Sequence, residues 1–439
     1  MRLMQANMQN VGSLRFISFA TRPLGGLLGR RARREAMCLP GVRSALIIRL
    51  DEIGDLVMTT PLLRELRRNA PQAWITLVVK PELRNLVETC PYVDEVLPFA
   101  WKGHGRLGPA ARLGRALCFS MSWLWRRRFD LALLPRWDVQ YRDDAFLAYF
   151  SGAARRVGYS EKVNALKSQL NRGFDALLTH PLLDTSLKHE VERSLGLLHF
   201  LGGRVADDRL ELWTSQADED FASAVLAARH AAAGGPVVAF SPSAGRSPLK
   251  QWPVQRFAEL GQAILQRTGA RILLVGGPED AGLGEHIERA LGAWAINLVG
   301  KTTLRQLVAL LKRSAVFVGN DSGPMHIAAA SDTPVVALFG SSCPHRFGPW
   351  TKAKEIIVHE QACAPCHSSG HLDRCRKCVH PEPACMQAIS VQEVLGHVLR
   401  LLARGTAPAC PPGGAAILAG ESAACERRPV SEAGHERSP

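Results

Sequence analysis

The chain has 439 residues, too many for one hydrophobic core, so its length predicts two domains. Hydrophobic residues make up 46% and charged residues 21% of the chain, and no apolar run reaches the roughly 18 residues of a membrane-spanning helix, which argues against a disordered or spanning protein. The net charge of +14 comes from two segments, because residues 1–43 hold eight arginines against one glutamate and residues 102–128 hold seven basic residues and no acid. A nucleic-acid-binding protein more often spreads its basic residues over a reading surface, so no nucleic-acid partner is predicted.

The N-terminal segment is strongly basic. Residues 1–34 contain seven arginines and no acid, which resembles an organellar transit peptide, but the compact apolar region and cleavage site of a secretory signal are absent. We interpret residues 1–43 as a flexible basic extension suited to binding a surface. The odd number of cysteines, 11, argues for a reducing compartment, so we expect the protein in the cytoplasm.

A first series of alternating strands and helices lies between residues 44 and 210. Strands are predicted at 44–49, 74–79, 93–97, 131–134 and 156–159, and helices at 56–68 and 83–89. Such alternation with short connections is typical of a parallel sheet covered by helices. Residues 44–210 are therefore expected to form an N-terminal Rossmann-like domain.

The second basic segment interleaves arginines with aromatic residues. Arg126, Arg127 and Arg128 directly follow Trp123 and Trp125. Arginines beside tryptophans favour the interface of an anionic membrane. A solvated helix face with buried tryptophans has the same composition, so both interpretations stay open.

A second alternating series begins near residue 236. Strands are predicted at 237–240, 271–275, 296–299, 315–318 and 334–338, and helices at 254–268 and 304–311. We assign residues 211–404 to a C-terminal Rossmann-like domain, with the link around 205–235 and a disordered tail at 405–439. Two such domains face each other across a cleft lined by the carboxyl ends of both sheets, where open α/β sheets bind ligands.

The first loop expected at this cleft is Arg49-Leu-Asp-Glu-Ile-Gly-Asp55. Gly54 permits a tight turn, and Asp55 comes at the start of a helix. A carboxylate there is suited to accept a proton from an acceptor hydroxyl, as a general base does. An ordinary helix cap is the alternative interpretation.

Two further loops follow strands of the C-terminal domain. Residues 243–253 place Ser243 before the cations Arg246 and Lys250, which are suited to neutralise a diphosphate, although loop cations are usually only solvated. Residues 276–279 end in Glu279, whose carboxylate after a strand has the chemistry to bind a ribose diol.

The fourth loop, Gly-Asn-Asp-Ser-Gly-Pro-Met-His at 319–326, joins a buried strand to a helix. Backbone N–H groups at such a helix start bind anions, phosphate above all. Asp321 and His326 add polar groups to the same crevice. The alternative is an ordinary N-cap at Asp321 or Ser322, with His326 in the core.

The cysteine-rich loop at 363–385 carries a spacing known from zinc sites. Its thiols are Cys363, Cys366, Cys375 and Cys378, with a middle gap shorter than in the usual zinc ribbon, and Cys385 follows. A structural zinc and unligated thiols in a loop over the cleft are both compatible with this spacing.

These loops, in this order, resemble glycosyltransferase family 9, the bacterial lipopolysaccharide heptosyltransferases and their relatives. The motifs that carry the resemblance are Ile-Ile-Arg-Leu-Asp-Glu-Ile-Gly-Asp-Leu-Val-Met-Thr-Thr-Pro at 47–61, Leu-Lys-Gln-Trp-Pro at 249–253, the segment 319–326 and the late cysteines at 363–386. The resemblance covers residues 45–402, nearly the whole chain outside its two tails.

The resemblance implies a two-domain fold of the GT-B type that transfers a sugar with inversion from a nucleotide-diphosphate donor, typically ADP-heptose. It places the acceptor on the side of residues 44–210 and the nucleotide sugar in residues 211–404. No cofactor is expected for catalysis. By position, Asp55 matches the proposed general base of the family. Lys250 matches the lysine at the donor phosphates, and Glu279 matches the acid at the ribose. In the last motif, Asp321 matches the acid near the sugar, Ser322 and Gly323 match the phosphate turn, and His326 matches the closing histidine. Ser243 departs from the family pattern, which often has Asn/His-Pro-Gly where this chain has Ser-Pro-Ser at 241–243.

The acceptor implied by the resemblance is an anionic glycolipid of the lipopolysaccharide-core type, reached at the inner leaflet by a cytoplasmic or peripheral membrane protein. Two alternatives remain at this point. A nucleotide-sugar epimerase of the same fold would alter the donor without an acceptor, and a non-catalytic membrane or nucleic-acid binding module would not need the four loops. The sequence leaves the sugar, the linkage and the oligomeric state open.

Overall fold

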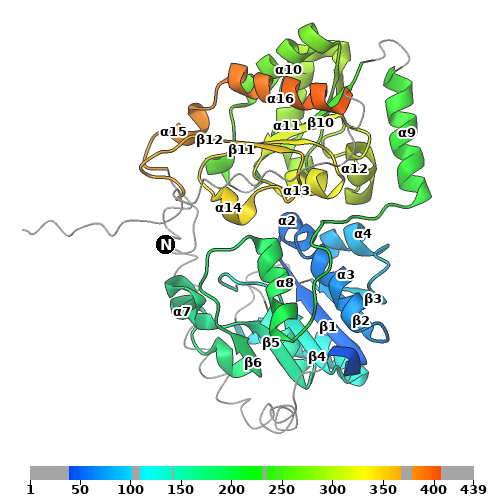
Figure 1. Cartoon of the computed structure of the whole chain (residues 1–439), viewed down its shortest axis with the longest axis vertical. Coiled ribbons are helices and arrows are strands. Elements are labelled where there is room, and N and C mark those ends of the chain that lie inside the picture. Colours follow the sequence, from blue (N-terminus) through cyan, green and yellow to red (C-terminus); the bar gives the residue numbers. More distant parts are fainter. Residues whose placement is uncertain are drawn as a thin grey trace, which may run out of the picture.

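The chain folds into two halves, each built around a six-stranded sheet (Figure 1). The computed structural model describes residues 39–100, 109–140, 143–230, 235–245, 247–366 and 378–406. The strand orders are β3-β2-β1-β4-β5-β6 and β12-β11-β10-β7-β8-β9, and every neighbouring pair is parallel. The predicted fold class, two Rossmann-like α/β halves facing each other, is confirmed.

The first sheet is built from residues 44–182. Its strands are β1 (Ser44–Arg49), β2 (Trp74–Val79), β3 (Glu95–Pro98), β4 (Leu131–Leu134), β5 (Arg155–Tyr159) and β6 (His180–Leu182), and its helices are α2 (Ile53–Val57), α3 (Thr60–Asn69), α4 (Arg84–Val87), α5 (Pro109–Phe119), α6 (Asp144–Phe150), α7 (Ala165–Leu170) and α8 (Glu190–Phe200). The short edge strand β6 and the helix α8 were not predicted from the sequence.

The helix predicted at 56–68 is wrong as a single element, because the chain forms two helices with a break at Met58 and Thr59. Pro61 lacks an N–H group, and a proline ring clashes with the carbonyl four residues earlier, here that of Val57. The hydroxyl of Thr60 donates to this Val57 carbonyl at 2.8 Å, which satisfies the group that the break leaves without a helical partner.

The second sheet follows with the same architecture. Its strands are β7 (Val237–Ser241), β8 (Arg271–Leu274), β9 (Ala295–Asn297), β10 (Val316–Asn320), β11 (Val335–Phe339) and β12 (Lys354–Val358), and the helices of this half of the chain are α9 (Gln216–His230), α10 (Val254–Thr268), α11 (Ala281–Leu291), α12 (Leu304–Leu311), α13 (Gly323–Ala330), α14 (Pro344–Phe347), α15 (Ala384–Gln387) and α16 (Val391–Thr406). The segment expected as a link contains α9, which lies beside α12 (Figure 1).

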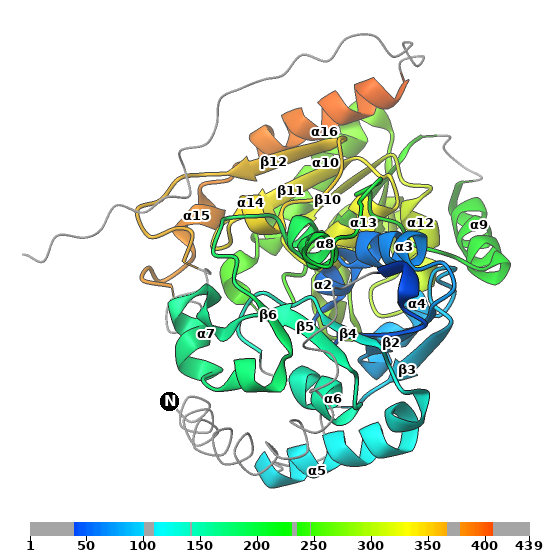
Figure 2. The same ribbon diagram turned by 60° about the horizontal axis from the view of Figure 1, so that its bottom comes forward.

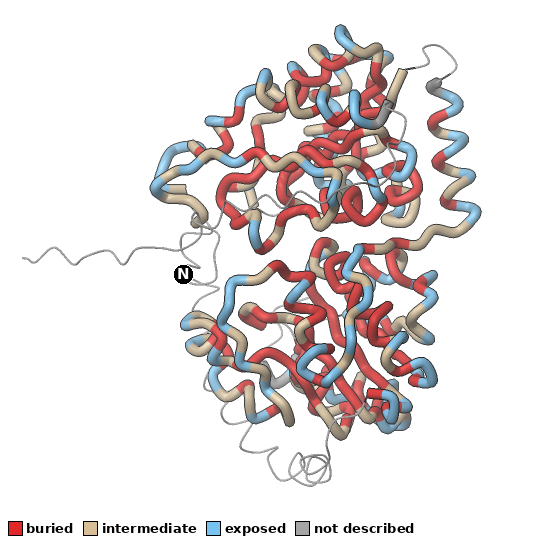
Figure 3. The backbone as a smooth tube through the Cα atoms, viewed as in Figure 1, coloured by how far each residue is buried: buried red, intermediate tan, exposed pale blue. Residues whose placement is uncertain are grey.

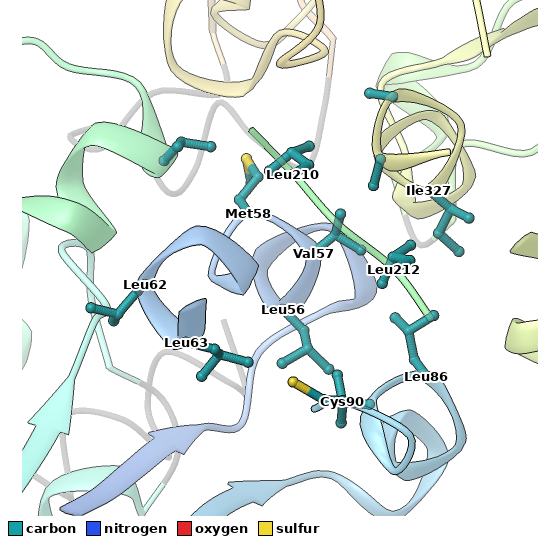
Figure 4. Packing of buried hydrophobic residues seen from close by; sticks show 14 of the residues in the cluster. Leu56, Val57, Met58, Leu62, Leu63, Leu86, Cys90, Leu210, Leu212 and Ile327 are labelled. Atoms are coloured by element: carbon teal, nitrogen blue, oxygen red, sulfur yellow. The ribbon is translucent and has the colours of Figure 1, made fainter. Parts of the chain in front are cut away.

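The apolar core continues from one half into the other. Buried residues fill the strands of both sheets and also the region where the halves meet (Figure 3). One cluster joins α2 and the segment before α9 to α13, and Figure 4 shows its members Leu56, Val57, Met58, Leu210, Leu212 and Ile327. The loops after β1 and β10 are therefore held against each other by packing.

Candidate active site

Asp55 lies in the loop after β1, at the third position of α2. Its carboxylate accepts a hydrogen bond from the Glu52 N–H at 3.1 Å and lies 3.5 Å from Nη2 of Arg49. Asp55 is therefore not the N-cap residue itself, which is Glu52, but it caps the helix from its third position by accepting the N-cap N–H. The side chain of Asp55 is 28% exposed, so the protein does not enclose it completely.

Burial raises the pKa of Asp55, the Arg49 guanidinium lowers it, and the negative charge of Glu190 raises it further. The net direction is upward from the ordinary value of 3.8. A carboxylate with a raised pKa is a stronger proton acceptor. This environment suits a general base that receives a proton from a hydroxyl group.

Lys250 and Asp321 form an ion pair in the other half of the molecule. Lys250 ends the short helical turn Pro248–Lys250, and its ammonium donates to the Asp321 carboxylate at 2.7 Å. The hydroxyl of Ser342 donates to the same carboxylate oxygen at 2.5 Å. Burial alone would raise the pKa of Asp321, but Lys250, together with His326 and Ser342, holds it below its usual value, so the Asp321 carboxylate is ionised at pH 7.

Asn320 fixes the two loops around this ion pair, a role that sequence reasoning did not assign. Its side-chain carbonyl accepts from the Trp252 N–H at 3.0 Å, and its amide donates to the Pro242 carbonyl at 2.9 Å. These bonds fasten residues 242–252 to the end of β10. The Asn-Asp pair after a buried strand was the only signal in the sequence for this function.

His326 connects the two halves. It is buried on α13, and a Cβ atom added to Gly54 would lie 2.6 Å from its Cδ2 atom. A Cβ on Gly323 would similarly lie 2.8 Å from the Cβ of Ile53. Burial lowers the pKa of His326 to about 4, so the ring is neutral at pH 7. The structure therefore brings the Asp55 loop against the helix that follows Asp321.

The remaining predicted donor-binding residues differ in burial and in their contacts. Ser243 is buried and its hydroxyl accepts from the Gly245 N–H at 3.1 Å. Ser322 precedes α13 and its hydroxyl donates to the Asn320 carbonyl, while Glu279 is exposed on the turn Pro278–Asp280. Arg246 lies outside the described residues, as do Cys375 and most of both tails.

A second charged cluster near Asp55 was missed entirely. The guanidinium of Arg346, on α14, donates to the Glu190 carboxylate of α8 at 2.6 and 3.1 Å. Arg346 also lies 5.0 Å from the ring centre of Trp137, and Arg193 lies 3.7 Å from the same ring. Arg346 and Glu190 are 156 positions apart, so no local pattern reveals the pair.

In the cysteine-rich loop, Cys363, Cys378 and Cys385 are free thiols. Within the described ranges, no three histidine, cysteine or acidic side chains are arranged to hold a metal ion. Since Cys375 is outside those ranges, the structural zinc stays a prediction.

Comparisons with known proteins agree with this geometry. A family model described as glycosyltransferase family 9 (heptosyltransferase) matches residues 127–375. The chain is 31% identical to lipopolysaccharide heptosyltransferase 2 of Salmonella typhimurium, over 71% of this chain and 87% of the relative, and 28% identical to lipopolysaccharide heptosyltransferase 3 of Escherichia coli, over 68% and 83%. The solved structure of E. coli ADP-heptose lipopolysaccharide heptosyltransferase II matches with a TM-score of 0.64 and 26% identity, over 83% of this chain and 100% of that chain.

Proposed function

This chain belongs to glycosyltransferase family 9, and from that membership we propose that it transfers heptose to the lipopolysaccharide core with Asp55 as the general base. Its substrates are a nucleotide-sugar donor and a lipopolysaccharide acceptor. ADP-heptose is the proposed donor, since the solved relative from E. coli is described as an ADP-heptose enzyme. The observation that supports this assignment most is the contact of His326 with Gly54, because it joins the Asp55 loop to the Asp321 helix.

The proposed reaction is a single in-line displacement. An acceptor hydroxyl attacks the anomeric carbon of the heptose while Asp55 takes the hydroxyl proton. The bond between the anomeric carbon and the nucleotide diphosphate breaks on the opposite side of the sugar. The departing diphosphate takes the bonding electrons, and Lys250 stabilises its negative charge. Lys250 then exchanges part of its contact with Asp321 for the diphosphate. Base and phosphate-binding groups come from different halves because they act on opposite faces of the sugar.

The acceptor is a glycolipid, so we propose that the protein works at the cytoplasmic face of the membrane that contains this lipid. No helix in the described ranges is long and apolar enough to span a bilayer. A peripheral association fits the basic and aromatic residues of the first half. The N-terminal basic extension, of which residues 1–38 lie outside the described ranges, is not needed for this argument.

Replacing Asp55 with Asn tests the base. Asn keeps an oxygen that accepts from the Glu52 N–H, but it cannot take a proton, so kcat is expected to fall about 10²- to 10⁴-fold. Donor affinity, measured by titration calorimetry with ADP-heptose, should stay within about twofold of wild type.

Asp220→Asn, at an exposed acid of α9, serves as the matched control and should leave kcat unchanged. Loss of donor binding in Asp55→Asn would contradict the assignment of Asp55 as a base. Conversion of the donor in the absence of acceptor would instead identify an epimerase.

A further inference from the structure

Exposed large apolar side chains are concentrated in one short strip of the sequence in the first half. Ten large apolar residues of the described ranges are exposed, and four of them lie within nine consecutive positions: Leu117, Met121, Trp123 and Trp125. The two tryptophans are 53% and 49% exposed. We call these four residues the tryptophan ridge. Scattered exposed apolar residues need no explanation, but such a concentration marks an interaction surface.

The ridge has a fixed conformation. After α5 the chain continues through a wide turn, Ser120–Leu124, and a tighter one, Trp125–Arg127. Leu124, between the two tryptophans, is fully buried in the cluster beneath, so both indoles are held outside. The ring of Trp125 lies over Gly152, where an added Cβ would be 3.1 Å from Cδ1. The exposed indoles are therefore positioned by the core below them.

The ridge is bordered by positive charge. Arg126 and Arg128 are exposed, and Arg127 pairs with Glu95. The sequence has no acid between residues 102 and 128. Indole rings partition to the interface of a bilayer, and arginines beside them attract anionic headgroups. A protein partner would not require this one-sided charge, whereas an anionic lipid surface matches both features of the strip.

The ridge belongs to the half that carries Asp55. Figure 2 shows α5 at the outer edge of this half, on the side away from the second sheet. Docking through this edge leaves the second half free to exchange the donor. We propose that the tryptophan ridge, with Arg126 and Arg128, docks the protein on an anionic phospholipid bilayer. This rests on the proposed function, because that bilayer holds the glycolipid acceptor.

Vesicle sedimentation of the full chain tests the ridge. The probes are vesicles of phosphatidylethanolamine with a minor share of phosphatidylglycerol, and neutral phosphatidylcholine vesicles. The double change Trp123→Ser and Trp125→Ser is expected to weaken binding to the anionic vesicles about tenfold. Trp74→Ser, at an equally exposed tryptophan on β2, is the matched control and should bind as wild type.

The charge is tested separately. Arg126→Gln with Arg128→Gln is expected to weaken binding to anionic vesicles about tenfold while leaving binding to neutral vesicles unchanged. Arg172→Gln with Arg267→Gln removes the same charge from exposed positions elsewhere and should have no such effect. Melting temperatures of all variants establish that each is folded.

Ridge variants that bind anionic vesicles like wild type would overturn the proposal. A change of oligomeric state without vesicles in the tryptophan variant would assign the ridge to a second copy of the chain and overturn it as well. Transfer to a delipidated, water-soluble core oligosaccharide should match wild type in the tryptophan and arginine variants of the ridge. If the wild-type protein shows no such transfer, the proposed function is contradicted instead.

Discussion

Gly54 has no substitute in this fold, since the imidazole of His326 occupies the space where any side chain would begin. The sequence indicated a glycine that allows a tight turn, but the physical reason is the close approach of another helix. For Asp55, a capping bond could be predicted from its place near a helix start. Its raised pKa could not, because burial, the main cause, and the nearby charge of Glu190 both arise only in the tertiary structure. Local roles of residues are predictable, and their long-range neighbours are not.

Gly54→Ala is predicted to damage both folding and catalysis. The new Cβ would lie 2.6 Å from Cδ2 of His326, so the two loops must separate, which costs about 1 to 3 kcal/mol of the free energy of unfolding and lowers kcat. Urea unfolding and transfer assays measure both effects. Gly41→Ala, with no atom within 4 Å of the new Cβ, is the control. Combining Gly54→Ala with His326→Ala should restore the free energy of unfolding but not kcat. If the double variant is as unstable as Gly54→Ala alone, the contact with His326 is contradicted.

At the scale of elements, the predictions succeed where the pattern is local. Strand β1 and helices α10 and α12 match their predicted bounds, because buried apolar runs and helical periodicity lie within each segment. The helices α8, α9, α11 and α16 were not predicted. The break between α2 and α3 was missed although Pro61 signals it, because the apolar spacing continues through the break.

The first turn of α8 has a predictable effect on catalysis. Glu190→Gln removes a negative charge that raises the pKa of Asp55, while Arg346 keeps its second acidic neighbour Asp138 at 3.4 Å. Loss of the Glu190 charge lowers the pKa of Asp55, so the acidic limb of the kcat–pH profile should move to lower pH. Glu259→Gln, at an exposed acid of α10, should leave the profile unchanged.

The same variant should lose about 3 to 5 kcal/mol of stability, because a buried ion pair loses one partner. Replacing Arg346 with Met in addition should restore most of that loss. An acidic limb that stays in place, or moves to higher pH, would show that Glu190 does not act on Asp55.

For the whole molecule, the order of the four loops was enough to predict two facing sheets and a site between them. Their packing was not predictable, because an apolar residue in a sequence does not say whether its partner is in the same half. Val57 and Ile327 are such a case, since both belong to one cluster although they lie on helices of different halves, α2 and α13. The edge strand β6 was also not predicted, because it has three residues, one of them a proline, and so short a segment shows no apolar periodicity.

This shared cluster makes the two lobes thermodynamically interdependent. Separation of the two halves would expose to solvent the apolar side chains of α2 and α13 that are buried in the native protein. Differential scanning calorimetry should therefore record one heat-absorption peak with a van't Hoff enthalpy equal to the calorimetric one. Two resolved peaks would disprove it. A fragment limited to the second half of the chain should aggregate, and co-expression with the first half should restore its solubility.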